Sequence, residues 1–538
     1  MASTRWSEAV SRHGMVCTPH RLASEAGVAA LRDGGNAIDA AVAAAATIAV
    51  VYPHMNGIGG DSFWLIHDAA NDRLKGLNAA GRSAAGVDAD WYRATFGASI
   101  APRGGPAALT VPGTVAGWWS AHAYSRESLG SPLGWPALLE HAIAHAREGF
   151  EVSDGQRRVT ALAAPLFTAS IAGEVRRSFW PIFHPDRLRA GRFTQPDLAR
   201  TLAQIAGGGA DELYRGALGQ RIAAAATTLG SPLRAEDFAE HRAEWVEPLR
   251  IAYRGGEAVS LPPPTQGFAA LAILGLLDGF DVAGLDDADH VHLVVEATKI
   301  AFEDRDRWLA DPGFVDIPVA ECLDPARLAR RRERISMARA MPVDGSPADG
   351  DTIAIATADA RGNAACLIQS IYHEFGAAIV AGDTGVLLQN RGCFFSLDPS
   401  HPNALAPRKR TAHTLIPSMY LAGGRPRFVY GTMGGEGQPQ TQAALVTRLV
   451  DRGLGVQAAV EAPRWLLGRT WGETTRALRL EARFAAGVIE TLRGRGHDAH
   501  AVDDWSDLMG HAQVIAVDAD GAIRGGSDPR ADGAALGT

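Results

Sequence analysis

The chain has 538 residues and a formal net charge of −8, with a pI of about 6.1 and a mean hydropathy of −0.04. A nucleic-acid-binding domain is usually strongly basic, so this balance argues against a nucleic-acid partner. The longest apolar run, residues 40–52, is too short to cross a bilayer and predicts a buried helix. The first residues hold no apolar core of a signal peptide, so we expect a cytoplasmic protein that has no membrane partner.

The length is sufficient to bury a large core without covalent staples. The four cysteines are scattered and form no C-x-x-C pair: Cys17, Cys322, Cys366 and Cys393. This spacing predicts neither a disulfide framework nor a zinc cluster, and buried free thiols fit a reducing compartment.

Two helices and a strand are expected first. Ser24 predicts the cap of a helix over 25–32, and Asn36 predicts the start of an alanine-rich helix that packs closely in the interior. A glycine-rich turn over 54–61 then leads into residues 62–67, which are typical of a strand.

The middle of the chain is expected to be helical. Apolar residues recur at spacings of three and four in 135–149, 197–205 and 288–309. A further apolar helix is expected over 266–277, after the stiff loop at 262–264.

The composition changes near residue 340. Residues 341–351 (MPVDGSPADGD) are rich in Pro, Gly, Asp and Ser, which predicts an exposed, mobile linker. An apolar run over 352–358, a turn at 359–363 and a second run over 364–371 follow. This pattern predicts a β-hairpin whose first strand begins at Thr352.

Familiar catalytic and metal motifs are absent from the sequence. It contains no G-x-S-x-G elbow, no P-loop and no complete G-x-G-x-x-G fingerprint. His290 and His292 are two residues apart, so on a helix they point to different faces. His141 and His145 could share a face, but Ala142 stands where H-E-x-x-H needs glutamate. We interpret all four as ordinary helix-surface histidines and expect no metal and no organic cofactor.

Eight segments, in chain order, resemble the gamma-glutamyltranspeptidase family. They are HGMVCTPHRLASEAGVAALRDGGNAIDAAVAAA from His13, PHMNGIGGDSF from Pro53, LTVPGTVAGW from Leu109, LPPPTQGF from Leu261, HLVVEATKIAFEDRDRWLADP from His292, DTIAIATADARGNAA from Asp351, FGAAIVAGDTGVLLQN from Phe375 and GTMGGEGQPQTQ from Gly431. Because the agreement covers nearly the whole chain in order, the chain is identified as a member of that family.

The resemblance implies an α+β fold, the four-layer αββα sandwich of the N-terminal nucleophile hydrolases. It also implies a zymogen that cuts itself autocatalytically, here between Asp351 and Thr352. A large fragment, 1–351, and a small catalytic fragment, 352–538, would then build one αββα unit together. Whether these fragments assemble further is left open.

The chemistry of a free N-terminal threonine agrees with this resemblance. Its α-amine has an ordinary pKa of about 7.7–8.0, so near neutral pH it can accept the hydroxyl proton while Oγ attacks an amide carbonyl. The resemblance makes Thr352 that nucleophile and implies that Ser370 supports it by hydrogen bonding. It assigns the oxyanion hole to Gly434 and Gly435, where a bare backbone can approach the substrate closely.

The substrate-binding positions depart from the family pattern. The Asn, Gln or Glu, and Asp that hold a substrate α-amino group in transpeptidases are replaced by Tyr372, Arg391 and Phe394. The two serines that hold the α-carboxylate appear as His413 and Thr414. A site that lacks acidic and amide acceptors binds an α-ammonium group poorly, and Arg391 repels it.

An anionic substrate without that amine fits these positions better. Arg82 matches a family arginine that grips the substrate carboxylate, and a guanidinium can do so through two parallel hydrogen bonds. The segments QNRGCFFSLDPSHPNALAPRKRTAHTLIPSM from Gln389 and GGSDPRADGAALG from Gly525 resemble the branch containing oxamate amidohydrolases and cephalosporin acylases.

We therefore expect an autoprocessing N-terminal-threonine amidohydrolase that acts on a small carboxylate-bearing amide, such as oxamate, through an acyl-enzyme on Thr352. Two alternatives stay open. One is a gamma-glutamyl hydrolase or acyltransferase that acts on glutathione-like substrates. The other is a non-catalytic, uncut binding or scaffold protein.

Overall fold

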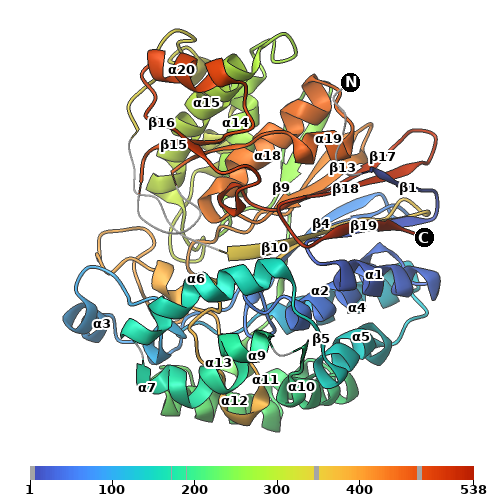
Figure 1. Ribbon diagram of the computed structural model, residues 1–538, viewed down its shortest axis with the longest axis vertical. Coiled ribbons are helices and arrows are strands. Elements are labelled where there is room, and N and C mark those ends of the chain that lie inside the picture. The colour runs from blue at the N-terminus through green and yellow to red at the C-terminus, as the bar shows by residue number, and fades with distance from the viewer. Residues whose placement is uncertain (1–6, 171, 190, 344–350, 469–474) are drawn as a thin grey trace.

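Two antiparallel β-sheets pack face to face, with helices over both outer faces (Figure 1). The computed structural model describes residues 7–170, 172–189, 191–343, 351–468 and 475–538, and within these each sheet has seven strands. One sheet has the order β1 (Ala9–Ser11), β18 (Ile523–Ser527), β17 (Ala512–Val517), β13 (Arg425–Thr432), β12 (Ser418–Ala422), β9 (Gly256–Ser260), β8 (Leu249–Tyr253). The other has the order β19 (Ala534–Gly537), β2 (Gly14–Thr18), β10 (Asp351–Asp359), β11 (Ala364–Tyr372), β3 (Asp61–Asp68), β4 (Arg73–Asn78), β7 (Glu244–Val246).

Each sheet combines strands from before and after Thr352. In one sheet, β2, β3, β4 and β7 precede this residue, whereas β10, β11 and β19 contain or follow it. In the other, β1, β8 and β9 precede it, and β12, β13, β17 and β18 follow. Neither part of the chain can complete a sheet alone. The division into fragments at this point remains a prediction.

An apolar layer fills the space between the sheets. Strand β10 shows how it is built, because its side chains alternate between two faces. Ile353 and Ile355 belong to the core shared with the helices below, whereas Ala354 and Ala356 face the opposite sheet. The first residues of β10 are therefore held from both sides.

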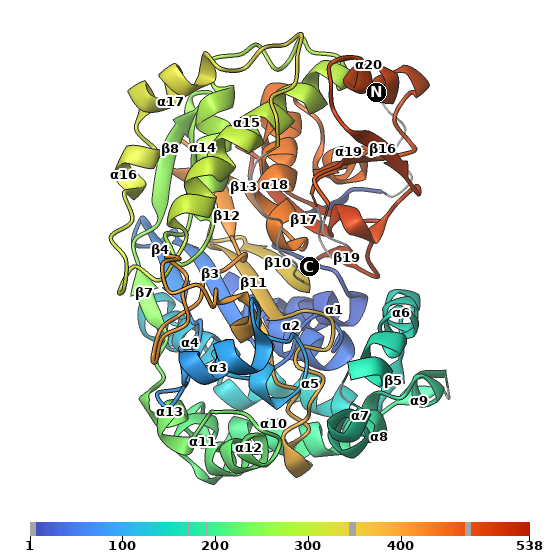
Figure 2. The same ribbon diagram turned by 90° about the vertical axis from the view of Figure 1, so that its left-hand side faces the viewer.

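Helices cover the outer face of each sheet (Figure 2). Helix α2 (Ala37–Val51) is buried along its whole length against β10 and β11, beneath α1 (Arg21–Arg32) and α5 (Trp135–Glu148). On the sheet that contains β8, β9 and β13, α14 (Gly267–Leu277) and α18 (Gln438–Val446) contact the strands, and α15 (Asp287–Trp308) packs on both helices.

The other helices lie mainly around the sheet that contains β10 and β11 and near the ends of α15. They are α3 (Ala89–Phe96), α4 (Thr114–Leu129), α6 (Asp154–Ser170), α7 (Ala172–Glu174), α8 (Trp180–Phe183), α9 (Pro185–Arg189), α10 (Pro196–Gly208), α11 (Asp211–Tyr214), α12 (Ala217–Thr228), α13 (Ala235–Glu240), α16 (Val319–Cys322), α17 (Pro325–Arg332), α19 (Val456–Glu461) and α20 (Ala486–Gly494). Two small sheets contain β5 (Phe150–Glu151), β6 (Arg192–Phe193), β14 (Trp465–Leu467), β15 (Leu478–Glu481) and β16 (Ala499–Val502).

Most predicted elements are confirmed. The β10–β11 hairpin, the strand at β3 and helices α5, α10, α14 and α15 lie where the sequence placed them. Asn36 caps α2: its side chain accepts from the N–H groups of Ile38 and Asp39, and the Asp39 carboxylate accepts from Asn36 N–H. The predicted linker falls largely on 344–350, which lies outside the described residues.

Two local predictions are wrong. Helix α1 starts at Arg21 with His20 as its cap, and Ser24 lies inside the helix. The Ser24 hydroxyl bonds the carbonyl of Ala534, so it ties α1 to β19 rather than capping it. His290 and His292 are buried rather than exposed, because α15 is covered on several sides.

The sequence predicted buried free thiols and no membrane-spanning helix. Cys17, Cys322 and Cys366 are buried free thiols and Cys393 is a half-buried one. Among the described residues, every helix is too short or too polar to traverse a bilayer.

Candidate active site

Thr352 lies in the interior at the start of β10. Its side chain is fully buried, and its Oγ1 has no hydrogen-bond partner among the described residues. The register between β10 and β11 shifts between Asp351 and Ile353, so Thr352 sits in a bulge-like irregularity, a feature that often re-aims a side chain beside an active site. Leaving a buried hydroxyl unpaired costs about 1–3 kcal/mol, so this arrangement needs a reason, and a reacting oxygen supplies one.

The backbone that faces Thr352 is strained. Ile353 pairs with Gln369 and Asp351 with Tyr372, so Thr352 lies opposite two residues of β11, Ser370 and Ile371. Asp351 pairs with Tyr372, whose φ of 80° lies in the left-handed region that bulky residues avoid. Such conformations cost of order 1–3 kcal/mol and gather at functional sites, so strain is stored directly opposite the Asp351–Thr352 peptide bond.

Ser370 lies on β11 close to this bulge. Its Oγ accepts a hydrogen bond from the backbone N–H of Tyr372 at 2.8 Å, and the side chain is buried. Gly60 packs directly against the carbonyl of Ser370, since a Cβ at that glycine would lie 2.1 Å from the oxygen. This close approach fixes the position of Ser370 next to the predicted nucleophile.

Gly434 and Gly435 form a tight turn between β13 and α18. Their φ angles, 134° and 50°, both lie in the region that favours glycine. Gln266 holds the turn from the side: its Nε2 donates to the carbonyl of Gly435 at 2.9 Å and to that of Thr414 at 3.0 Å. The turn leads into a helix N-terminus, whose dipole favours negative charge. This geometry suits an oxyanion hole.

Arg391 is a buried guanidinium with unused donors. Its Nη2 donates to Thr414 Oγ1 at 3.3 Å, and its Cζ lies 3.8 Å from the centre of the Tyr372 ring. Its Nε and Nη1 have no partner among the described residues. Burial is the main reason that the pKa of Arg391 falls to about 10. A desolvated cation with unused donors can form charge-assisted hydrogen bonds with a carboxylate.

His413 is buried beside Arg391 and bonded to Asp61. The distance from His413 Nε2 to Asp61 Oδ2 is 3.2 Å, and His413 Nδ1 has no partner among the described residues. Burial, then the charge of Arg391, holds the pKa of His413 well below its ordinary value. Burial raises the pKa of Asp61 to about 7. Asp61 was missed by sequence reasoning, although an acidic residue directly after Gly59-Gly60 and before a buried strand was a usable signal.

Arg82 is not part of this network. Its side chain is 41% exposed, with Nη2 donating to Glu244 Oε1 at 3.0 Å and Nη1 to the carbonyl of Arg408 at 3.3 Å. Its neighbour Gly81 does reach the network, because Gly81 N–H donates to Asp61 Oδ1. The predicted grip of Arg82 on a substrate carboxylate has no support in these contacts and stays a prediction.

A cavity of about 480 Å³ borders the network. Its lining includes Gln266, Arg305, Phe394, Thr414 and Glu436. Thr414 and Gln266 connect it to Arg391 and to the glycine turn, so the cavity is a candidate entrance for substrate. Arg305 was missed by sequence reasoning; it is buried and ion-paired with Asp306 at 2.6 Å and with Glu436 at 3.4 Å.

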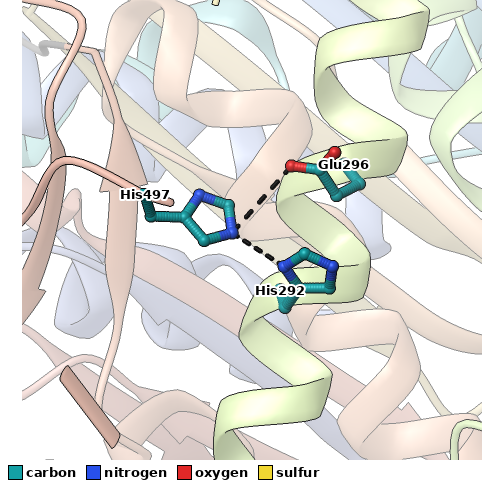
Figure 3. Close-up of side chains that lie close together, drawn as sticks. All are labelled: His292, Glu296 and His497. Carbon is teal, nitrogen blue, oxygen red and sulfur yellow. Dashed lines mark hydrogen bonds and ion pairs between the residues drawn. The ribbon is translucent and has the colours of Figure 1, made fainter. Parts of the chain in front are cut away.

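A second polar cluster lies apart from this site (Figure 3). His292 and Glu296 from α15 meet His497, with His292 Nδ1 2.8 Å and Glu296 Oε1 3.9 Å from His497 Nε2. The donor types would suit a zinc-like ion. However, Lys299 Nζ already pairs with Glu296 Oε1 at 2.6 Å, and Met341 N–H donates to Glu296 Oε2 at 2.8 Å.

The donor and acceptor atoms of this cluster are used in hydrogen bonds that hold neighbouring backbone, so they do not form an open metal site. His292 Nε2 lies 2.8 Å from the carbonyl of Ser336, and Lys299 donates to the carbonyl of Met341 at 2.7 Å. These bonds fix the chain shortly before the segment 344–350. Sequence patterns could not reveal the cluster, because His497 is 205 residues away from His292.

Comparisons with known proteins agree with this architecture. Residues 23–538 match the family model described as Gamma-glutamyltranspeptidase. The chain is 46% identical over 532 residues to the Glutathione hydrolase-like YwrD proenzyme of Bacillus subtilis, covering 97% of this chain and 98% of that protein. It is 45% identical over 538 residues to the Oxamate amidohydrolase proenzyme of Klebsiella pneumoniae, covering 99% of both.

The fold has a close structural counterpart. The crystal structure of cephalosporin acylase from Bacillus halodurans superposes with a TM-score of 0.92 and 34% identity, covering 100% of this chain and 98% of that one. The chain belongs to the gamma-glutamyltranspeptidase family, and it is an amide hydrolase of the kind made as a proenzyme. The predicted family and the predicted αββα fold are confirmed.

Proposed function

We propose that the chain cuts itself between Asp351 and Thr352, and that the freed Thr352 hydrolyses a small carboxylate-bearing amide such as oxamate. The observation that carries this proposal is the buried Thr352 Oγ1, without a partner among the described residues, at a strained bulge where Tyr372, the partner of Asp351, stacks on the guanidinium of Arg391. The fragments would be 1–351 and 352–538.

Self-cleavage starts with Thr352 Oγ. The oxygen attacks the carbonyl carbon of Asp351, the C–N bond breaks as the hydroxyl proton passes to the Thr352 nitrogen, and an ester joins the Asp351 carbonyl to Oγ. Water then hydrolyses the ester, leaving a carboxylate on Asp351 and a free α-amine on Thr352. Strain at Tyr372, which pairs with Asp351, raises the energy of the uncut backbone and favours this step.

Amide hydrolysis repeats the same chemistry on a substrate. The α-amine of Thr352 accepts the hydroxyl proton, Oγ attacks the amide carbonyl, and the amine product leaves with a proton. Backbone N–H groups of Gly434 and Gly435 stabilise the oxyanion, a term worth roughly 10²–10³ in rate for one donor. Ser370 helps to orient Oγ, and water hydrolyses the acyl-enzyme.

The buried Arg391 decides the substrate class. A substrate carboxylate can pair with its free Nε and Nη1, whereas an α-ammonium about 5 Å away would be repelled by roughly 3 kcal/mol at an effective dielectric of about 20. This favours an amide of a short oxo acid over a gamma-glutamyl amide. Tyr372, His413 and Thr414 would complete the wall of the pocket around that carboxylate.

Glutathione-like substrates are the second candidate, because the chain is as similar to a Glutathione hydrolase-like proenzyme as it is to an oxamate amidohydrolase proenzyme. The third alternative, a non-catalytic scaffold, is set aside because the chain is an enzyme of this family.

The test compares ammonia release from oxamate with glutamate release from a gamma-glutamyl anilide, using wild type, Thr352→Ala and Thr357→Ala. Thr357 is a matched control, since it is a buried threonine on the same strand whose hydroxyl is bonded to the carbonyl of Ala37 at 2.7 Å. The proposal expects ammonia release by wild type and Thr357→Ala alone. Glutamate release without ammonia release would favour the second candidate.

A further inference from the structure

Asp61 and His413 form a buried pair in the proposed carboxylate pocket. Each side chain is only 1% exposed, and Asp61 lies opposite Ser370 in the register of β3 with β11. Oδ1 of Asp61 accepts from Gly81 N–H at 2.9 Å and from Gln389 Nε2 at 3.1 Å, while Oδ2 faces His413 Nε2. Two donors therefore fix which oxygen meets the imidazole.

This arrangement sets the tautomer of His413. An ionised carboxylate can only accept, so His413 must carry its proton on Nε2, and Nδ1 is left as a bare acceptor. Nδ1 has no partner among the described residues, and neither do Nε and Nη1 of the adjacent Arg391. Asp61, His413 and Arg391 then carry no net charge together before a ligand binds.

A carboxylate that enters this pocket adds one negative charge. Among the described residues, the charged or titratable groups found to interact with Asp61 are His413, Arg391 and Tyr214, and those found to interact with His413 are Asp61 and Arg391. Burial already raises the pKa of Asp61 to about 7, so a further buried anion makes protonation of the pair easier still. A proton on His413 Nδ1 would turn an acceptor into a donor aimed at the carboxylate.

We propose that Asp61 is a positioning residue whose bond to His413 makes carboxylate binding take up one proton, so that imidazolium and guanidinium grip the anion together. The inference rests on the proposed function for its ligand class, a small carboxylate. Asp61 acts through His413 and does not touch the ligand. In the free protein the pair holds this extra proton only below about pH 7; the bound pair holds it at higher pH.

The pH dependence follows from this linkage. Above about pH 7 the free pair is deprotonated, so each bound carboxylate draws a proton from solution, and affinity falls as pH rises. The fall approaches about tenfold per pH unit when one whole proton is taken up. Below about pH 7 the free pair already holds the proton, so the affinity becomes flat.

Asp61→Asn gives a result that a merely structural residue would not give. Gly81 and Gln389 still demand an acceptor at Oδ1, so the new amide nitrogen takes the Oδ2 position and donates to His413 Nε2. His413 is then forced into the other tautomer, with a proton on Nδ1. This variant should bind carboxylates without taking up a proton and with an affinity that barely changes with pH.

The experiment is calorimetry of oxalate binding to the enzyme near pH 8, in HEPES and in Tris, whose different ionisation heats count the protons. Oxalate has no amide, so the count is independent of turnover. Wild type should take up close to one proton per oxalate, and Asp61→Asn and His413→Gln none. His67→Gln is a matched control at the other end of β3 and should keep the wild-type count.

The outcomes separate this inference from the proposed function. Absent proton uptake in wild type, or equal uptake in wild type and Asp61→Asn, overturns the role of Asp61, even if oxamate is hydrolysed. Absent oxalate binding also overturns it, whereas the proposed function is judged by self-cleavage and ammonia release. If Asp61→Asn does not fold, the wild-type proton count alone decides.

Discussion

Replacing Arg391 by methionine should weaken carboxylate binding strongly while hardly changing the stability of the fold. The side chain is buried, and no acidic group within ion-pair distance is found among the described residues. Burial is the main reason that its pKa falls from its ordinary value to about 10, which corresponds to about 3 kcal/mol against the charged form. The methionine removes that penalty.

The same substitution also removes favourable contacts. The stacking on Tyr372 is worth about 1–2 kcal/mol and the hydrogen bond to Thr414 about 1 kcal/mol. The net change in the free energy of unfolding should therefore stay within about 1 kcal/mol. Loss of two charge-assisted hydrogen bonds to the substrate is worth about 3–4 kcal/mol, so KM for oxamate should rise roughly 10²–10³-fold.

Arg464 provides the matched control. It is equally buried and its pKa is also lowered to about 10, yet it pairs with Asp528 at 2.6 Å and donates to the carbonyl of Gly510 at 2.9 Å. Arg464→Met leaves a buried carboxylate short of a partner and should lose about 3–5 kcal/mol.

The assay is urea unfolding in the Thr352→Ala background, where a single covalent chain unfolds, together with KM measured in the active enzyme. The reasoning is refuted if Arg391→Met loses as much stability as Arg464→Met, or if its KM for oxamate stays within about threefold of wild type.

Three further predictions follow from the same contacts. Gly434→Ala places a Cβ on a residue with φ of 134°, so kcat should fall roughly 10²–10³-fold with an unchanged circular dichroism spectrum, and an unchanged kcat would exclude this turn as the oxyanion hole. The Thr352 α-amine must be neutral to accept a proton, so kcat should rise as the pH passes through about 7.7–8.0. KM should rise above about pH 7, because Asp61 then stays ionised. Measuring kcat and KM as functions of pH tests both effects. Glu296→Gln breaks a buried pair with Lys299 and should lower the free energy of unfolding by about 3–5 kcal/mol, while zinc or EDTA should leave Tm unchanged; a zinc-dependent rise in Tm would instead reveal a metal site.

Local patterns predicted the scaffold of the site well. The apolar run that begins at Thr352 and the turn after it gave the β10–β11 hairpin, and Asn36 gave the start of α2 through its capping box. These features depend on neighbours within a few residues, so short-range rules suffice for them. Ser24 failed as a cap because its hydroxyl serves a distant strand, β19, which no local pattern encodes.

The pairings inside the site could not be predicted locally. Asp61 and His413 are 352 residues apart, and only the tertiary fold brings β3 against the loop before β12 that carries His413. Arg82 was assigned to the pocket by its motif position, and in the structure its side chain pairs with Glu244 and is partly exposed, so its role stays a prediction. The family resemblance predicts which residue types recur at given positions, whereas the direction in which such a side chain points depends on its neighbours in the fold.

The central claim is that Thr352 becomes an N-terminal nucleophile, and intact-protein mass spectrometry of wild type and Thr352→Ala tests it most directly. The account predicts two wild-type fragments, the smaller one beginning TIAIATAD, and a single uncut chain for the variant. A wild-type chain that stays whole after long incubation, or a cut at another peptide bond, would contradict it.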